Sequence, residues 1–537
     1  MKNKLELLKN ITSYLNPLGV FIFLISGIFI ALFFGISRRE WIKNFIFVFV
    51  CLLLIGAFFI NIYGYITKGE FSSSLFTSGI FETFETALIL FFAVICLAII
   101  FIFNRRNAHF VKIIMIFLFS LISVLVLVIS KNFMSFFISI GCFLISFFAL
   151  ATISNDSRMT VNGENIKESK ALLLQSGISR SMSRFFIASL FFMVLLFFGF
   201  SILYGVSDVK NFLQLYQDIE SSGINIILSL IIVSIAFYFY LGIFPFQAPY
   251  IDFSNKAEPS SLYLLWLFYF PAGIIALLKF TPIISILNKN LKAGSYILYI
   301  LLIAVFLGST GSGIAGLKTK SLRKIASYIF TLIFTGYFIN MAMLITGFIK
   351  DDNLSWLNIY YLAFIAINFL PLAFIFSFIE NASKKDSVDS LRSLVYKDKF
   401  IGIAFLISMF SLIGIPGLFG YPGKKYYIDL IINIFKADTN GLASIQGWLI
   451  LIIVIIYIAA FTAVSLRLII LLFMKENKDT DTISQYNFSK AFYVLIGIFM
   501  VLILFFGIIG LLETLNPGIN LLGSRITNSA IFTKNLK

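Results

Sequence analysis

The sequence predicts an all-α polytopic membrane protein with about fourteen transmembrane helices, and three observations support this fold class. Of the 537 residues, 60% are hydrophobic and 12% are charged, whereas soluble domains are roughly half apolar and a quarter charged. Long apolar runs recur along the chain, and the basic residues behind the net charge of +16 lie mostly between these runs. This pattern excludes a soluble enzyme, a disordered chain and a nucleic-acid-binding module.

The apolar runs give the expected positions of the helices. A helix needs about 20 apolar residues to cross the roughly 30 Å hydrocarbon layer of a bilayer. Runs of about this length occupy residues 18–37, 44–66, 85–104, 110–130, 132–153, 185–205, 224–247, 260–285, 295–317, 325–349, 356–380, 400–437, 447–474 and 491–513.

The loops between these runs predict the orientation of the chain. Alternate loops on one side of the membrane carry 24 Lys and Arg residues, and the other side, which includes both termini, carries 13. Basic residues accumulate in loops on the inner side of a membrane. We therefore expect both termini on the outer side.

Two of the spans contain an internal proline in a comparable setting. Pro245 lies in the Gly-Ile-Phe-Pro-Phe stretch of the seventh span, and Pro416 lies in the Gly-Ile-Pro-Gly stretch of the twelfth. Proline removes a backbone hydrogen bond, and in lipid the freed carbonyl must be satisfied by protein or water. Broken helices five spans apart indicate two repeated halves around a polar path; the alternative is a pair of simple packing kinks.

Redox ligands are scarce. Cys51, Cys96 and Cys142 lie separately within apolar runs and read as buried small hydrophobic residues, and His109 is the single histidine. We expect this chain to hold no iron–sulfur cluster, haem or metal ion.

Several stretches carry a resemblance to a known family, and one of them is Leu203-Tyr204-Gly205 at the end of the sixth span. Residues 236–261 contain FPFQAPYIDFSNKAEPSS, residues 318–328 read KTKSLRKIASY, and residues 390–427 run from SLRSLVYKDKF to SLIGIPGLFGYPGKKYY. In order and spacing they resemble the antiporter-like membrane subunits of respiratory complex I (NADH-quinone oxidoreductase), most closely subunit N, the mitochondrial subunit 2. The resemblance covers about residues 115–475.

The resemblance implies an architecture. Helices 4–8 and 9–13 would form two inverted five-helix repeats, with helices 7 and 12 broken. The expected divisions are residues 1–109 for helices 1–3, residues 110–285 for the first repeat, residues 286–474 for the second, and residues 475–537 for helix 14 and the tail.

The resemblance also implies a function and a location. The chain would be a non-redox, multi-pass subunit of a proton-translocating NADH:quinone oxidoreductase in an energy-transducing inner membrane, either bacterial or mitochondrial. It would have no catalytic centre of its own and bind no cofactor. NADH, FMN, iron–sulfur clusters and quinone would belong to partner subunits, and its neighbours would include antiporter-like paralogues and the lipid bilayer, but no nucleic acid.

The residues implied to move protons are largely missing. The family places a glutamate in helix 5 and lysines in helices 7, 8 and 12, and the corresponding residues here are Gly141, Tyr240, Phe270 and Lys424. Only Lys424 keeps its residue type. Tyr240 is expected to be a poor relay, because a phenol keeps its proton at neutral pH.

Other ionisable residues admit ordinary interpretations. Lys424 is either a terminal proton-exchanging lysine or a lysine paired with Asp429 at a helix end. We expect Lys279 to extend toward the membrane interface, and Glu82 and Glu85 to lie at the interface where they complement a helix dipole.

Four functions are compatible with these residues. The first is a proton-conducting complex I subunit with a modified route, and the second is a structural spacer of the same complex, since a lysine and its acidic partner would be lost together. The third is a cation/proton antiporter subunit, and the fourth is an unrelated flippase or solute carrier. The third should keep the family's ionisable residues even more strictly, and the fourth would not explain the paired prolines.

Overall fold

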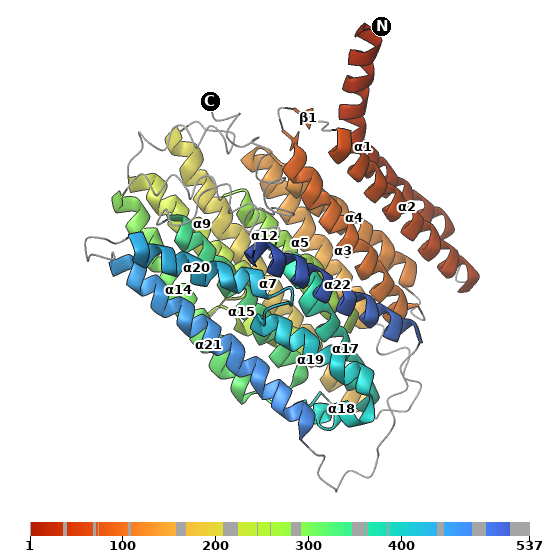
Figure 1. The fold of residues 1–537 in the computed structure, drawn as a ribbon. Helices are drawn as coiled ribbons and strands as arrows, with labels where there is room; N and C mark the ends of the chain where they lie inside the picture. Colours follow the sequence, from red (N-terminus) through yellow and green to blue (C-terminus); the bar gives the residue numbers. More distant parts are fainter. Residues whose placement is uncertain are drawn as a thin grey trace. The chain divides into compact units, whose positions relative to one another are not determined.

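The described part of the chain is almost entirely helical (Figure 1). The computed structural model describes residues 2–35, 40–67, 71–73, 75–105, 109–156, 168–207, 224–243, 245–257, 259–280, 291–345, 360, 363–383, 386–437, 445–474 and 490–515. Within them, ten helices are long and apolar enough to cross a membrane, and four shorter apolar helices lie at 18–34, 228–240, 367–380 and 399–413. The predicted helical membrane fold is confirmed; the count of fourteen spans stays a prediction.

The chain divides into two compact units. The first unit contains residues up to Tyr240 and then Lys256–Ile283. Its helices are α1 (Lys2–Phe34), α2 (Glu40–Thr67), α3 (Ile80–Asn104), α4 (Phe110–Ile129), α5 (Phe133–Asp156), α7 (Glu168–Ser207), α9 (Ile224–Tyr240), α11 (Pro259–Leu264), the π-helix η2 (Leu265–Tyr269) and α12 (Phe270–Leu278). The predicted divisions at residues 109, 285 and 474 stay predictions.

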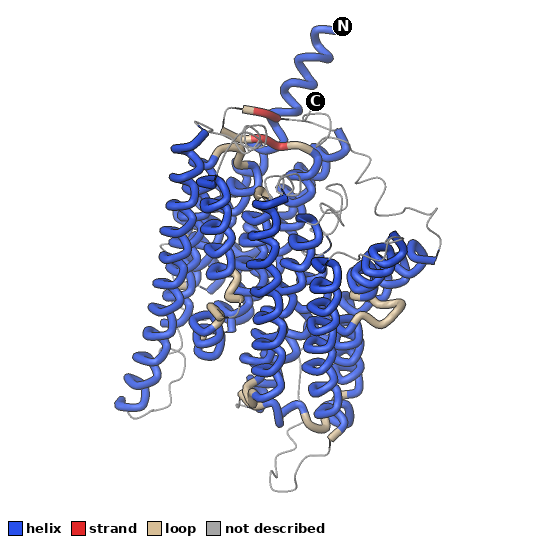
Figure 2. Tube along the Cα trace, turned by 90° about the vertical axis from the view of Figure 1, so that its left-hand side faces the viewer, coloured by secondary structure: helices blue, strands red, loops and turns tan. Residues whose placement is uncertain are grey.

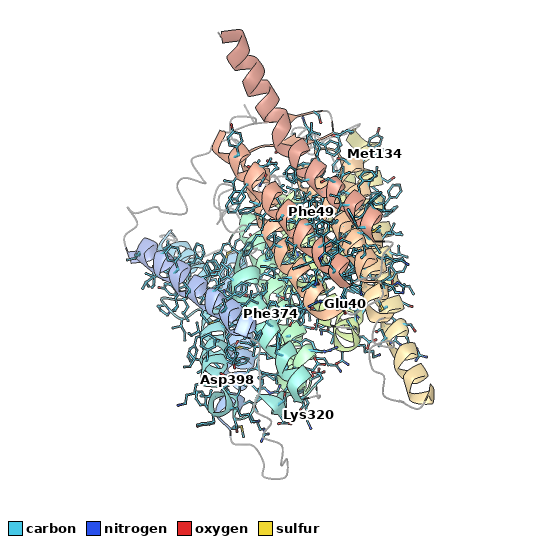
Figure 3. All side chains as sticks on the ribbon, turned by 90° about the vertical axis from the view of Figure 1, so that its right-hand side faces the viewer. Glu40, Phe49, Met134, Lys320, Phe374 and Asp398 are labelled. Carbon is cyan, nitrogen blue, oxygen red and sulfur yellow. The ribbon has the colours of Figure 1, made fainter. Side chains whose placement is uncertain are left out.

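A short hairpin joins α2 to α3 in the first unit. Strands β1 (Phe71–Ser72) and β2 (Thr77–Ser78) pair antiparallel, with Phe71 opposite Ser78 (Figure 2). The hairpin leads directly into the N-terminus of α3. Figure 3 shows the side chains of these helices, with Glu40 at the start of α2 and Phe49 farther along the same helix.

The second unit contains Leu241–Asn255 and the chain after Ile284. Its elements are α10 (Ala248–Lys256, all but its last residue), α14 (Leu291–Lys318), α15 (Leu322–Ile345), the π-helix η3 (Ile365–Phe369), α17 (Leu370–Ser383), the 3₁₀-helix η4 (Val388–Leu391), α18 (Leu394–Lys397), α19 (Lys399–Ile413), α20 (Tyr421–Ala437), α21 (Ile445–Phe473) and α22 (Lys490–Leu515). Helices α14 and α21 lie side by side (Figure 1).

Both π-helices have a cause in the sequence. Pro271 follows η2 by two residues and Pro371 follows η3 by two residues. A proline cannot donate to the carbonyl four residues earlier and its ring clashes with that carbonyl, so the turn before it widens. These two prolines therefore distort their helices without breaking them.

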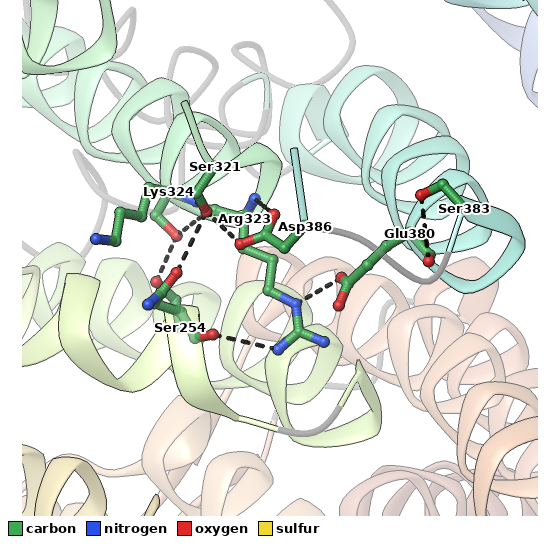
Figure 4. A network of polar contacts seen from close by, with 9 residues as sticks. Ser254, Ser321, Arg323, Lys324, Glu380, Ser383 and Asp386 are labelled. Carbon is green, nitrogen blue, oxygen red and sulfur yellow. Dashed lines mark hydrogen bonds and ion pairs between the residues drawn. The ribbon is translucent and has the colours of Figure 1, made fainter. Parts of the chain in front are cut away.

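A charged network fixes the helix ends of the second unit (Figure 4). The Arg323 side chain donates from Nε to Glu380 Oε2 at 2.6 Å, which joins α15 to α17. Asp386 accepts hydrogen bonds from the Ser321 hydroxyl and, at 3.2 Å, from the Arg323 backbone N–H. The α14–α15 turn is thereby tied to the segment before η4.

Candidate functional site

The three first-half positions that the resemblance singled out lie in the first unit. Gly141 is in α5, Tyr240 is the last residue of α9, and Phe270 is the first residue of α12. A Cβ atom on Gly141 would meet Met193 Cε at 3.3 Å. This contact is slightly tight, so an added methyl group would require the flexible Met193 side chain to shift by a few tenths of an ångström.

Tyr240 is held by a second tyrosine. Its side chain is 1% exposed, and its hydroxyl donates to the Tyr269 carbonyl at 2.9 Å. The two rings stack with centroids 4.4 Å apart and an interplanar angle of 6°. The Tyr269 hydroxyl in turn lies 3.2 Å from Ser189 Oγ.

Phenylalanines close this site on several sides. The rings of Phe143, Phe147, Phe185 and Phe270 lie with centroids 5.0–6.1 Å from that of Tyr269. We call Tyr240, Tyr269 and these four residues the aromatic cluster. It contains no amine or carboxylate, so it offers no group that exchanges protons near neutral pH.

The second unit keeps a lysine at a helix break. Helix α19 ends at Ile413, α20 begins at Tyr421, and Pro416 lies between them. Gly414 has a φ of +92°, and its N–H and that of Ile415 both donate to the Phe410 carbonyl, which terminates α19. Pro245 lies in another helix interruption, between α9 and α10.

Lys424 contacts the end of α19 directly. Its Nζ donates to the Leu412 carbonyl at 2.5 Å and to the Ile413 carbonyl at 2.7 Å. It also lies 4.3 Å from the centroid of the Phe461 ring of α21. Terminal carbonyls, the negative end of the helix dipole and an aromatic face each favour a cation.

The structure shows no ion pair between Lys424 and Asp429. Asp429 is exposed, and among the described residues no carboxylate lies within ion-pair distance of Lys424. Because only neutral backbone oxygens and a ring hold the ammonium, no fixed negative charge opposes loss of its proton. A partly buried lysine in such surroundings can take up and release a proton.

Further polar groups of the second unit lie at this break. The Ser411 hydroxyl donates to Asn368 Oδ1 at 2.6 Å and accepts from the Gly420 N–H at 3.1 Å. Asn368 Nδ2 and both amide atoms of Asn340 are buried without a hydrogen-bond partner among the described residues. Buried amides of this kind are the usual binding sites of internal water.

Sequence reasoning missed Asn340, Asn368 and Ser411. A signal was present, because polar side chains within membrane helices are costly and tend to mark functional paths. The carbonyl partners of Lys424 left no such signal, since any residue type supplies a carbonyl.

The expected interfacial positions of Glu82, Glu85 and Lys279 stay predictions. The Glu85 side chain is buried within the protein, with 1% of the residue exposed. Lys279 lies 3.7 Å from Glu82, between Nζ and Oε1. The reason is tertiary, because the chain segment after α12 returns to the N-terminus of α3.

Comparison with known proteins identifies relatives of this chain. Residues 130–452 match the family described as NADH:quinone oxidoreductase/Mrp antiporter, transmembrane. NADH-quinone oxidoreductase subunit N 2 of Syntrophobacter fumaroxidans is 23% identical over 381 residues, which is 70% of this chain and 71% of that protein. Subunit N of a Wolbachia species from Brugia malayi is 23% identical over 332 residues, covering 59% of this chain and 62% of its own length.

Two solved structures share the fold. A chain of respiratory complex I from Thermus thermophilus superposes with a TM-score of 0.67 at 16% identity, covering 93% of this chain and 98% of that one. A chain of an archaeal membrane-bound sulfane sulfur reductase superposes with a TM-score of 0.71 at 14% identity, covering 98% and 99%. The matched family region includes Gly141, Tyr240, Phe270 and Lys424, and it begins after Glu85.

Proposed function

Because this chain belongs to the NADH:quinone oxidoreductase/Mrp antiporter transmembrane family, we propose that it is an antiporter-like membrane-arm subunit of a proton-translocating NADH-quinone oxidoreductase. The observation that carries the proposal is Lys424 at the α19–α20 break, with its Nζ on two backbone carbonyls. Relatives named as subunit N of that complex support the choice of assembly. The chain is a multi-pass protein of the energy-transducing membrane.

The proposed proton route runs through the second half alone. Lys424 exchanges the proton, and water bound at Asn340 and Asn368 supplies the path to it. The first half has no lysine at the family positions, and two of them, Tyr240 and Phe270, belong to the aromatic cluster. The same cluster favours the second candidate function, a structural spacer that leaves proton transfer to paralogous subunits.

The proposed architecture keeps fourteen transmembrane helices, with helices 4–8 and 9–13 as inverted repeats and both termini on the outer side. The ten long and four shorter apolar helices support this count. The chain itself has no catalytic centre, and NADH, FMN, iron–sulfur clusters and quinone bind to partner subunits. Membership of the family removes the unrelated flippase or solute carrier, and a cation/proton antiporter subunit remains as a rival.

The function is tested in membrane vesicles from cells that lack this chain. Without it we expect quinone-dependent proton translocation to fall, and expression of the full chain should restore it. Translocation and quinone reduction that are both untouched by the deletion would contradict the proposal. Sodium transport that persists when quinone reduction is blocked would favour the antiporter.

The orientation gives a separate prediction. Leu75 is exposed in the hairpin between α2 and α3, and Lys320 is exposed between α14 and α15. A membrane-impermeant maleimide should label a Leu75→Cys variant in intact cells or organelles, and a Lys320→Cys variant only after permeabilisation. The unsubstituted chain serves as the control for its three native cysteines. The reverse labelling pattern would show that the termini face inward.

The Tyr240→Phe variant tests whether the aromatic cluster takes part in proton transfer. The substitution removes one buried hydrogen bond to the Tyr269 carbonyl, which we expect to cost about 1 kcal/mol of stability. The ratio of protons translocated to electrons transferred should not change, because the phenol takes no part in proton transfer. A lower ratio of protons to electrons in a fully assembled complex would show that the aromatic cluster conducts protons.

A further inference from the structure

Two glutamates and one lysine meet in the first unit, away from the family positions. Glu82 and Glu85 lie on the first turns of α3, and Lys279 directly follows α12. We call these three residues the acid–lysine cluster. Their sequence separation is nearly 200 residues, and both glutamates lie before the matched family region of residues 130–452.

The outer part of the cluster is an ion pair at the helix ends. Glu82 Oε2 accepts a hydrogen bond from the Gly79 N–H at 3.0 Å, and Glu82 Oε1 lies 3.7 Å from Lys279 Nζ. The side chains of Lys279 and Glu82 are 15% and 18% exposed. They are therefore within reach of water or lipid headgroups at this face of the membrane.

The inner part of the cluster is a carboxyl group without a hydrogen bond. Glu85 lies one helical turn after Glu82, so the two side chains share a face of α3. Only 1% of Glu85 is exposed, and both of its carboxyl oxygens are buried without a hydrogen-bond partner among the described residues. The Glu85 carboxyl group is therefore closed to solvent.

Neighbouring polar side chains are already satisfied by one another. Asn61 of α2 donates to the Thr83 carbonyl at 2.6 Å and accepts from the Thr86 hydroxyl at 2.7 Å. They do not stabilise the Glu85 carboxylate. A buried ionised carboxylate without hydrogen bonds is unfavourable by several kcal/mol, which leaves a cation or a proton to stabilise Glu85.

Among the residues that the structure describes, Lys279 and Glu82 are the charged groups that act electrostatically on Glu85. On α2, Glu40 and Lys43 lie about 30 Å from the level of Asn61, at 1.5 Å per residue. On α4, Lys112 lies in the first turn, near the far end of α3. Elements α11 and η2 carry the tyrosines Tyr263 and Tyr269 and no charged residue.

The charge balance of the acid–lysine cluster favours the binding of a proton. One ammonium cannot neutralise two carboxylates, so the cluster has one unmatched negative charge when all three groups are ionised. Two carboxylates close together do not readily ionise at once. A proton bound on a carboxyl oxygen removes the imbalance, and the ion pair at the surface gives that proton a way in and out.

We infer that Glu82, Glu85 and Lys279 form a proton-exchange site that opens to the membrane face of the α2–α3 hairpin and ends at Glu85. The transfer is an O–H bond formed at the Glu85 carboxylate with a proton from water at the surface, and no electron is moved. The site gives the first half an acid–lysine pair in place of the family positions. Its use in translocation rests on the proposed function; its proton binding does not.

The test is infrared spectroscopy of the purified, assembled complex as the pH is varied. The C=O stretch of a protonated carboxyl should rise and fall reversibly in the wild type and disappear in Glu85→Gln. It should persist in Glu40→Gln, which removes an exposed carboxyl on α2. Lys279→Met should retain more of the band at each pH, because the ammonium no longer stabilises the carboxylate.

A second variant and an activity measurement complete the test. Glu85→Asp retains a carboxyl, so its band should shift in frequency and not vanish; this variant decides the matter if Glu85→Gln fails to assemble. A band that is unchanged in both variants overturns the inference. The quinone reductase activity of the same wild-type preparation scores the proposed function separately, so failure of one is distinguishable from failure of the other.

Discussion

Lys424→Ala is expected to slow proton transfer through this chain by about 10²-fold or more, the range for removing a positioned acid–base group. The ratio of protons translocated to electrons transferred should fall, while quinone reduction by the assembled complex continues. The measurement is proton translocation and quinone reduction in proteoliposomes that contain the purified complex. Lys425→Ala is the matched control, one residue away on the same helix.

Lys424→Arg separates proton exchange from structure. The guanidinium keeps the positive charge and donates to the α19 carbonyls, so assembly should survive better than in Lys424→Ala, where those carbonyls lose their donor at a cost of about 1–3 kcal/mol. Arginine does not release its proton in proteins. The ratio should therefore fall in both variants, and an unchanged ratio in both, with intact assembly, would establish the structural spacer.

Gly420→Ala is expected to destabilise the α19–α20 break by about 3 kcal/mol or more. A Cβ atom at residue 420 would lie 1.7 Å from the Ser411 carbonyl oxygen, and the obstructing atoms are backbone atoms that cannot rotate away. The Gly420 N–H also donates to the Ser411 hydroxyl, which donates to Asn368. Any shift of residue 420 would therefore disrupt these two hydrogen bonds. The amount of assembled complex and its thermal stability in detergent measure the effect.

Gly205→Ala is the control for this substitution. Gly205 is an exposed residue of α7, and a Cβ atom added there would meet no other atom within 4 Å. Alanine also favours a helix over glycine by about 1 kcal/mol. We expect this variant to assemble at least as well as the wild type. A Gly420→Ala protein as stable as Gly205→Ala would contradict the tight approach of the two helix ends.

The sequence anticipates the membrane helices because their cause is local. Apolar length decides whether a helix crosses a membrane, and the described helices follow the apolar runs. The interruptions also have a local cause, since Pro245 and Pro416 lie between helices. By the same rule Pro271 and Pro371 carry a signal for the two π-helices.

The sites depend on packing that no local pattern contains. Lys424 stands out in the sequence, but its partners are the carbonyls of Leu412 and Ile413, which any residues would supply. Glu85 reads as an interfacial residue because it opens an apolar run. Its burial depends on the packing of α3 against other helices, which include α11 and η2, both remote in sequence.

The central claim, that this chain works within a quinone-reducing membrane assembly, is tested most directly by what purifies with it. The full chain, tagged and extracted from its own membranes in mild detergent, should elute as a large complex that contains other antiporter-like subunits and reduces quinone. Recovery of a lone monomer or homodimer that transports ions by itself would contradict the account.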